Sequence, residues 1–184
     1  MKNLEEIYLH FCTTPSDINE HLPTLRSIAE ECETITEFGV RWVVSTWALL
    51  AARPKRLHCY DINHNPNIEN VKNLASQNNV DFKFDIANVI DNDFEIADTD
   101  FLFIDTLHTY DQLSQELTKH GNKAKKYLGF HDTITYGRIN ESGIKGDIQG
   151  LKPAIENYLL QNQEWIVHIH HTNNNGLTIL KRLS

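Results

Sequence analysis

The sequence predicts an α/β fold, in which a mostly parallel seven-stranded sheet lies between two layers of helices. β-prone runs alternate with helical patterns from residue 34 to residue 160, as they do in repeated βαβ units. Residues 100–105 contain an unbroken apolar run, which is typical of a strand buried on both faces of a parallel sheet. Asn175-Gly176 lies between the last two β-prone runs and indicates an antiparallel C-terminal hairpin.

Two helices are expected before the first strand. Apolar residues recur at helical spacing over 3–12, and Pro15 ends that pattern. A second helix is expected over 22–32, with Pro23 in its first turn, where a missing N–H costs little. The expected strands are 34–39, 56–61, 80–86, 100–105, 127–132, 165–171 and 177–183. The helices between them are expected over 45–52, 66–77, from about Tyr110 to Lys125, and 147–160, with a long loop over 133–146.

Length and composition suit one domain, made of an N-terminal helical cap (1–33) and a core (34–184). The net charge of −8 argues against a nucleic-acid partner. No apolar run approaches the ~20 residues of a membrane span, and acids stand where a signal peptide carries basic residues. We therefore expect a cytoplasmic protein without a membrane partner. The final hairpin or the N-terminal helices could support a homodimer.

Polar residues gather at the ends of the expected strands. In an open α/β sheet, ligands bind beyond the carboxyl ends of the strands, so these residues are candidates for a site. Acids at five consecutive strand ends are hard to explain by solubility alone. The residues are Glu37 with Gly39, Asp61, Asp85, Asp105 with His108, and His131 with Asp132.

The segment 34–46 predicts a strand, a tight turn at Gly39 and a helix start at Ser45, so that backbone N–H groups can face a ligand. Asp61 follows Gly39 by 22 positions and can bind the hydroxyls of a ribose. The alternative is a turn aspartate that caps the next helix. A nicotinamide-dependent oxidoreductase is disfavoured, because Gly39 is the only glycine between residues 1 and 120 and no G-x-G-x-x-G is present.

The strand-end segments resemble the motifs of a known family. They are Glu37-Phe38-Gly39, Tyr60-Asp61, Phe84-Asp85, Phe103-Ile104-Asp105-Thr106-Leu107-His108-Thr109-Tyr110 and Phe130-His131-Asp132. Over about residues 34–183 they resemble class I S-adenosylmethionine (SAM)-dependent methyltransferases. The most similar branch is the small one related to cephalosporin hydroxylase-like and macrocin O-methyltransferase-like proteins.

The resemblance implies a Rossmann-like three-layer sandwich, SAM as cofactor, and methyl transfer to a hydroxyl or an amine of a small molecule. It implies that Gly39 approaches the methionine part, Asp61 binds the ribose and Asp85 binds the adenine amino group. Glu37 would orient the turn, and Ser45 would cap the following helix. The complete set expected at the cofactor is Glu37, Phe38, Gly39, Ser45, Asp61, Ile62, Asp85, Ile86 and Asp105.

Val43 departs from the family pattern, which usually has a second glycine there. If this position has a positive φ, a β-branched residue is strongly disfavoured. The departure leaves a second function open, that of a non-catalytic SAM- or nucleotide-binding protein.

Asp105, His131 and Asp132 form a second group at the ends of neighbouring strands. Two carboxylates and a histidine could hold Mg²⁺ or Mn²⁺. Alternatively, the two aspartates bond backbone N–H groups at their strand ends. In a methyl transfer, His108 or His131 could remove the acceptor's proton if its pKa lies near the working pH. Asp105, His108 and His131 are thus the candidate catalytic residues.

Overall fold

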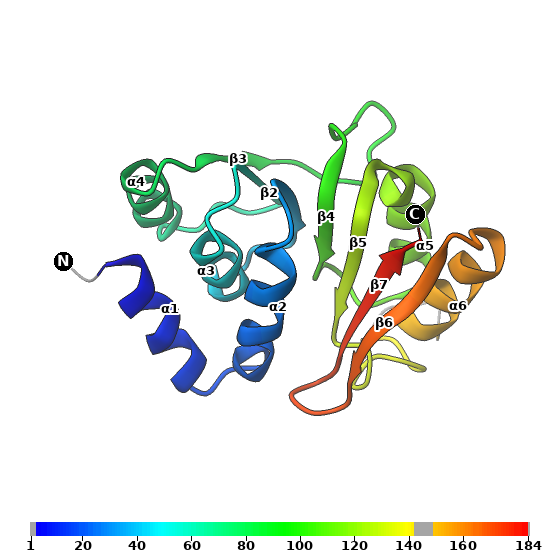
Figure 1. The fold of residues 1–184 in the computed structure, drawn as a ribbon. Coiled ribbons are helices and arrows are strands. Elements are labelled where there is room, and N and C mark those ends of the chain that lie inside the picture. Colours follow the sequence, from blue (N-terminus) through cyan, green and yellow to red (C-terminus); the bar gives the residue numbers. More distant parts are fainter. Residues whose placement is uncertain (1–2, 142–148, 184) are drawn as a thin grey trace.

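In the computed structural model, which describes residues 3–141 and 149–183, a seven-stranded sheet has helices on both faces (Figure 1). The strand order is β3-β2-β1-β4-β5-β7-β6. The first five strands are parallel, and β7 is antiparallel to both β5 and β6. The strands are β1 (Thr34–Phe38), β2 (Arg56–Asp61), β3 (Asp81–Ile86), β4 (Thr99–Ile104), β5 (Ala124–His131), β6 (Trp165–His171) and β7 (Leu177–Arg182).

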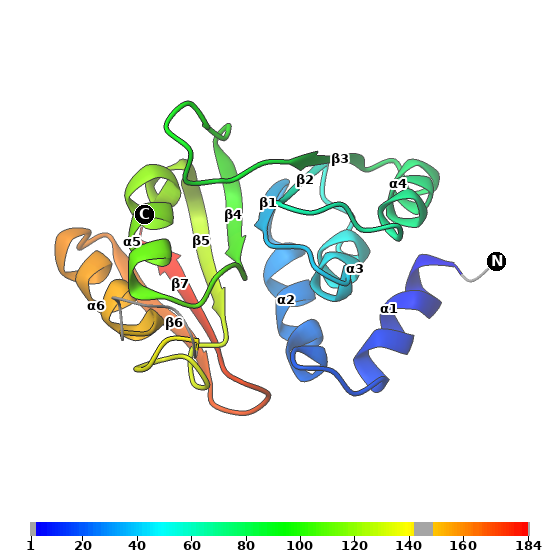
Figure 2. The same cartoon turned by 180° about the vertical axis from the view of Figure 1, so that it is seen from behind.

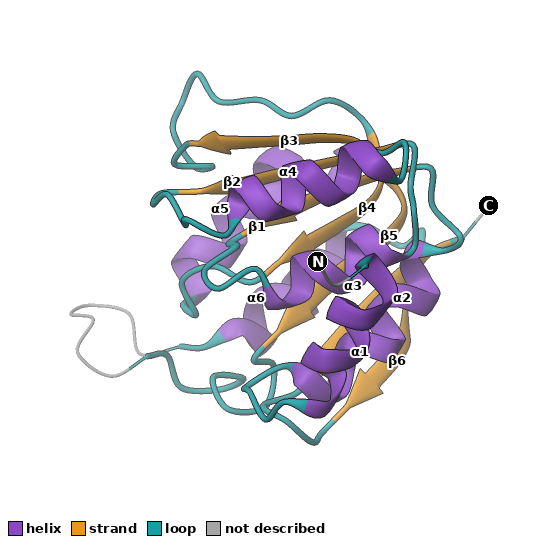
Figure 3. Cartoon of the chain, turned by 90° about the vertical axis from the view of Figure 1, so that its left-hand side faces the viewer, coloured by secondary structure: helices purple, strands orange, loops and turns teal. Residues whose placement is uncertain are grey.

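The helices form the two outer layers (Figure 2; Figure 3). One layer consists of α1 (Leu4–Thr13), the 3₁₀ turn η1 (Asn19–His21), α2 (Leu22–Ala29), α3 (Val44–Ala51) and α4 (Ile68–Gln77). The other consists of α5 (Tyr110–His120), the 3₁₀ turn η2 (Gly121–Lys123) and α6 (Leu151–Gln161). None of the helices in the described part of the chain is long and apolar enough to cross a membrane.

Strand β4 shows how the sheet serves both layers. Phe101 and Phe103 belong to the core that includes α1 to α4, whereas Leu102 and Ile104 belong to the core beneath α5 and α6. Successive side chains of a strand point to opposite faces, so the apolar run that predicted this strand fills both cores. The predicted three-layer α/β sandwich is confirmed.

The predicted hairpin is also confirmed, with β7 between β5 and β6. Helix α5 ends at His120, not near Lys125, because η2 follows at Gly121 and β5 already begins at Ala124. Helix α6 begins at Leu151 after its N-cap Gly150. The predicted start of this helix at 147 lies outside the described residues, as do residues 142–146 of the predicted loop.

The segment between α1 and α2 is bonded to the tip of the C-terminal hairpin. The Asn174 side chain accepts from the Glu20 N–H at 3.0 Å and donates to the Ser16 carbonyl at 2.8 Å. His21 Nε2 lies 3.0 Å from the Asn174 carbonyl oxygen. These contacts place the N-terminal helices beside the carboxyl ends of the central strands, where the candidate site lies.

Candidate functional site

The Gly39 turn brings the ends of three strands together. Gly39 has a φ of 81°, and a Cβ on it would lie 1.9 Å from the Asp105 carbonyl oxygen. Its N–H donates to the Tyr60 carbonyl at 2.9 Å. A positive φ and a neighbouring backbone at this distance leave glycine as the residue that fits. The turn after β1 is therefore packed directly on the chain that leaves β4.

Glu37 anchors this turn from inside the protein. Its carboxylate is fully buried and accepts from Ser45 Oγ at 2.6 Å and from Thr46 Oγ1 at 2.7 Å. Burial raises the pKa of Glu37 to about 7, although these hydroxyls and the Cys59 thiol stabilise the carboxylate. Glu37 thus ties the end of β1 to the first turn of α3. The predicted capping role of Ser45 is wrong, because Val43 is the N-cap and α3 has no side-chain cap.

Val43 adopts the backbone conformation for which a glycine was expected. Its φ is 60° and its ψ is 21°, and its side chain is completely buried. A non-glycine residue in this left-handed region costs on the order of 1–3 kcal/mol, and β-branching adds to the strain. The turn keeps this geometry with a valine because burial of the side chain offsets the strain.

A cleft of ≈510 Å³ opens in front of the Gly39 turn. Four residues predicted at the cofactor line it, namely Gly39, Asp61, Ile62 and Asp105. The other lining residues are Arg41, Tyr60, Asn63, Ala87, Asn88, Val89, Ile90, Thr106, Leu107, Gln112 and Glu141. The cleft lies beyond the carboxyl ends of β1, β2 and β4, where the topology of an open α/β sheet predicts a ligand.

Asp61 organises the loop at the mouth of the cleft. One of its oxygens accepts from the N–H groups of Val40 at 2.8 Å and Arg41 at 3.0 Å. The other accepts from the Asn63 N–H at 2.9 Å. An ionised carboxylate has about four acceptor positions, so three bonds leave room for a ligand hydroxyl. The N–H groups of Val40 and Arg41, which follow Gly39 in the turn, are thus bonded to Asp61.

The remaining residues predicted at the cofactor are not part of the cleft lining. Asp85 pairs with His58 Nε2 at 2.7 Å. Its neighbour Ile86 is 61% exposed. Glu37, Phe38 and Ser45 are buried behind the turn.

Several residues that line the cleft were not predicted from the sequence. Thr106 and Leu107 stand between Asp105 and His108, so their place in the motif was a usable signal. Gln112 and Glu141 come from a helix and a loop without any pattern that marks them.

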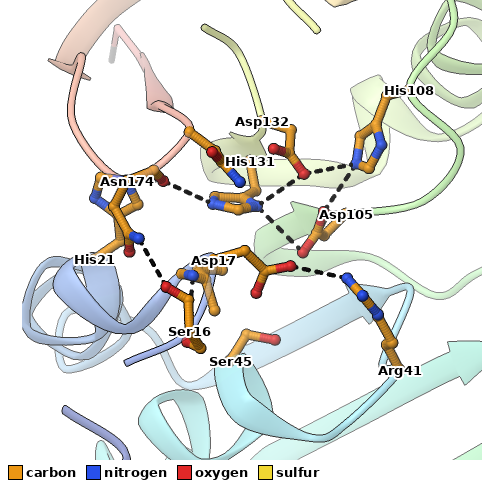
Figure 4. A network of polar contacts seen from close by, with 12 residues as sticks. Ser16, Asp17, His21, Arg41, Ser45, Asp105, His108, His131, Asp132 and Asn174 are labelled. Atoms are coloured by element: carbon orange, nitrogen blue, oxygen red, sulfur yellow. Dashed lines mark hydrogen bonds and ion pairs between the residues drawn. The ribbon is translucent and has the colours of Figure 1, made fainter. Parts of the chain in front are cut away.

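The second predicted group does come together (Figure 4). Each of Asp105, His131 and Asp132 offers one ligand atom, and these atoms lie within 4.8 Å of one another. His108 lies against the same carboxylates, with its Nε2 3.2 Å from Asp105 Oδ1 and 3.1 Å from Asp132 Oδ2. Its Nδ1 is 3.2 Å from Glu141 Oε1. Because Asp105 also lines the cleft, this cluster adjoins the proposed ligand space.

The hydrogen bond of His131 defines what its other nitrogen can do. His131 Nε2 lies 3.3 Å from the Asn174 carbonyl oxygen, which only accepts, so Nε2 carries a hydrogen. His131 Nδ1 lies 3.5 Å from Asp105 Oδ2 and 3.3 Å from Asp132 Oδ2. A lone pair facing two carboxylates is repelled, so Nδ1 needs a proton or a cation.

The pKa values of the cluster follow from the same contacts. Burial opposes protonation of His108 and His131, but hydrogen bonds to Asp105 and Asp132 outweigh it and raise each histidine pKa to about 10. Burial also opposes ionisation of the two carboxyls, but the histidine hydrogen bonds lower both aspartate pKa values. The prediction of a histidine with a pKa near the working pH is therefore wrong for these residues by themselves.

One carboxylate oxygen of Asp132 bears on the two interpretations of its role. Among the described residues, its buried Oδ1 has no hydrogen-bond partner. An aspartate that bonded backbone N–H groups at a strand end would have its oxygens satisfied. Carboxylate oxygens and an imidazole nitrogen are ligand types of divalent cations, so the group fits a cation in place of the proton on His131 Nδ1.

No protein-family model and no curated protein matches the sequence. Solved structures do share its fold. The O-methyltransferase TomG from Streptomyces achromogenes, in complex with SAM, has 12% identity and a TM-score of 0.61, over 98% of this chain and 88% of that chain. The N-methyltransferase NodS from Bradyrhizobium japonicum, with S-adenosylhomocysteine (SAH), has 13% identity and a TM-score of 0.57, over 100% of both chains.

A protein from Corynebacterium glutamicum has 13% identity and a TM-score of 0.65, over 98% of this chain and 88% of that chain. The chain shares its fold with the methyltransferases TomG and NodS. At such identities the likeness concerns the fold, and the cephalosporin hydroxylase-like branch stays a prediction.

Proposed function

We propose that the protein is a SAM-dependent methyltransferase that acts on a hydroxyl or an amine of a small molecule. One observation carries the proposal: Asp105 belongs both to the cleft and to the cluster with His131 and Asp132. A cofactor in the cleft would thus present its reacting end beside a group of acids and histidines. The SAM-bound and SAH-bound neighbours of the same fold support this assignment.

The chain's own residues suit the parts of SAM. Gly39 has no side chain, so the cofactor's amino-acid end can approach the backbone of the turn. Asp61 retains an acceptor position for a ribose hydroxyl. Ile62 and Val89 also line the cleft, and their apolar surface suits an adenine ring.

The cluster suits a divalent cation held by Asp105, His131 and Asp132. When bound, Mg²⁺ or Mn²⁺ would lower the pKa of an acceptor hydroxyl. The Asn174 carbonyl accepts from His131 Nε2, so a bound cation would replace the proton on Nδ1, and a second bond of this kind is usual behind a metal-binding histidine. His108 contacts the same two aspartates, and it would accept the acceptor's proton only when a bound cation offsets their charge and lowers the raised pKa of His108.

Titration with Mn²⁺ and SAH tests the two halves of the proposal separately. The wild-type protein should bind SAH, and it should bind one Mn²⁺, measured calorimetrically. Asp132→Asn should weaken Mn²⁺ binding at least about tenfold, because it removes a charged ligand. Asp98→Asn is the matched control, since Asp98 is an exposed acid paired with Lys125, and it should leave Mn²⁺ binding unchanged. Equal Mn²⁺ affinities of the two variants would contradict the cation site.

A non-catalytic SAM- or nucleotide-binding protein is the second candidate. The strained Val43 and the occupied N–H groups of Val40 and Arg41 favour it, because both reduce what the turn offers a cofactor. The two candidates differ in methyl transfer. Incubation with labelled SAM and a panel of hydroxylated and amine acceptors should give a methylated product and SAH. SAH binding without transfer to any acceptor would favour the second candidate.

A further inference from the structure

Glu116 is a buried acid that the proposed function does not use. It lies on α5, and its side chain is completely inaccessible to solvent. Its Oε1 accepts from Thr106 Oγ1 at 2.7 Å and from Gln112 Nε2 at 2.8 Å. Its Oε2 is buried and has no hydrogen-bond partner in the described part of the chain. A buried carboxylic acid is unfavourable for stability, which suggests that its hydrogen bonds from Thr106 and Gln112 have a role other than stabilising the fold.

Both partners of Glu116 line the cleft. The Gln112 amide is planar, with two N–H donors on Nε2 and an acceptor on Oε1 that lie at different edges of the group. One Nε2 hydrogen is bonded to the interior Glu116, and this bond fixes the orientation of the amide, so that its Oε1 and its second Nε2 hydrogen remain for other partners. The Thr106 hydroxyl likewise donates its single hydrogen to Glu116, so its oxygen can only accept from a ligand. One acid thereby leaves the Thr106 oxygen as an acceptor and fixes the orientation of the Gln112 amide in the cleft wall.

A ligand with hydrogen-bond donors fits such a wall. Asp85, which was expected to accept from the adenine amino group, pairs with His58 and is not part of the cleft lining. The amino group of a bound adenine therefore needs an acceptor from another element, and α5 offers Gln112 in the cleft lining.

We propose that Glu116 is a positioning residue that orients Thr106 and Gln112 as acceptors for an N–H or O–H group of the adenosyl part of SAM. The proposal rests on the proposed function. It assigns no contact between Glu116 and the ligand. The acid acts by fixing which atoms of its two partners face the cleft.

Calorimetric titration with SAH tests the orientation. Glu116→Leu removes the acceptor and should weaken SAH binding about tenfold, as expected for a lost ligand hydrogen bond. Glu116→Gln keeps an acceptor oxygen for both partners and should bind within about twofold of the wild type. In a Gln112→Leu background, Glu116→Leu should cause a much smaller loss than it does alone, because only Thr106 remains to be misoriented.

Leu117→Ala is the matched control for stability. Leu117 is the next residue of α5 and belongs to the core, so its truncation destabilises the same helix without touching either acceptor. It should leave the SAH affinity unchanged. An equal loss of affinity in Leu117→Ala and Glu116→Leu would overturn the proposal, as would wild-type affinity in Glu116→Leu.

The side-chain amide signals of Gln112 in ligand-free protein give a readout that does not depend on SAM. In the wild type and Glu116→Gln, the two Nε2 protons should have dispersed chemical shifts and slow exchange with water. In Glu116→Leu they should move to random-coil positions. Random-coil signals in the wild type would overturn the positioning role. Failure of the wild type to bind SAH would overturn the proposed function and the adenosyl ligand, while the amide signals would still decide whether Glu116 holds Gln112.

Discussion

Glu37 makes the stability of the protein depend on pH. Its pKa is raised by burial from 4.5 to about 7. The native state therefore keeps a proton that the unfolded chain loses above pH 4.5. The stabilisation that protonated Glu37 gives the native state is fully present below pH 4.5 and is lost as the pH rises through 7. At about 1.4 kcal/mol for each pKa unit, the free energy of unfolding should fall by about 3 kcal/mol across this window.

Urea unfolding of the wild type and Glu37→Gln between pH 4 and pH 8 measures this contribution. Glutamine has no carboxyl to titrate and keeps one acceptor oxygen, which serves one of the two hydroxyls that donate to different oxygens of Glu37. The difference in unfolding free energy between the two proteins should change by about 3 kcal/mol in favour of the variant as the pH rises from 4.5 to 7.5. Glu116, whose pKa burial also raises to about 7, is present in both proteins and cancels. Parallel pH profiles would refute the reasoning.

The backbone of the Gly39 turn gives two further predictions, each with a matched glycine or valine. Gly39→Ala should destabilise the protein by about 3 kcal/mol or more, because the added Cβ meets the Asp105 backbone at a position with positive φ. Gly121→Ala should cost about 1 kcal/mol, because the atoms nearest to the added Cβ belong to the Tyr158 side chain. Equal melting temperatures would contradict this. Val43→Gly should change the unfolding free energy by less than about 1 kcal/mol, because relief of strain offsets lost burial. Val40→Gly removes a buried side chain from a position outside the left-handed region and should cost about 2–3 kcal/mol. Similar losses of unfolding free energy in Val43→Gly and Val40→Gly would refute the strain at Val43.

The strands could be predicted because short stretches of neighbouring residues identify them. The apolar run around Phe103 and the Asn175-Gly176 turn each identify an element from a few neighbouring residues. The insertion of β7 between β5 and β6 was not predicted. The side chains of Leu177 and Ile179 in β7 pack in the core beneath α1 to α4. The position of β7 therefore depends on helices that are distant in sequence.

The site was predictable only where its residues end strands. Asp105, His131 and Asp132 converge because the carboxyl ends of neighbouring parallel strands meet at one edge of the sheet. Asp85 also ends a strand, but its pairing with His58 depends on the register between β2 and β3. The pKa values of the two histidines could not be predicted, because they result from carboxylates brought together by different elements.

Calorimetric titration of the wild-type protein with SAH, and with NAD in parallel, tests the central claim most directly. A cleft that opens at Gly39 and Asp61 and serves a methyltransferase should bind SAH in a 1:1 complex and should not bind NAD. Binding of NAD without binding of SAH would contradict the claim.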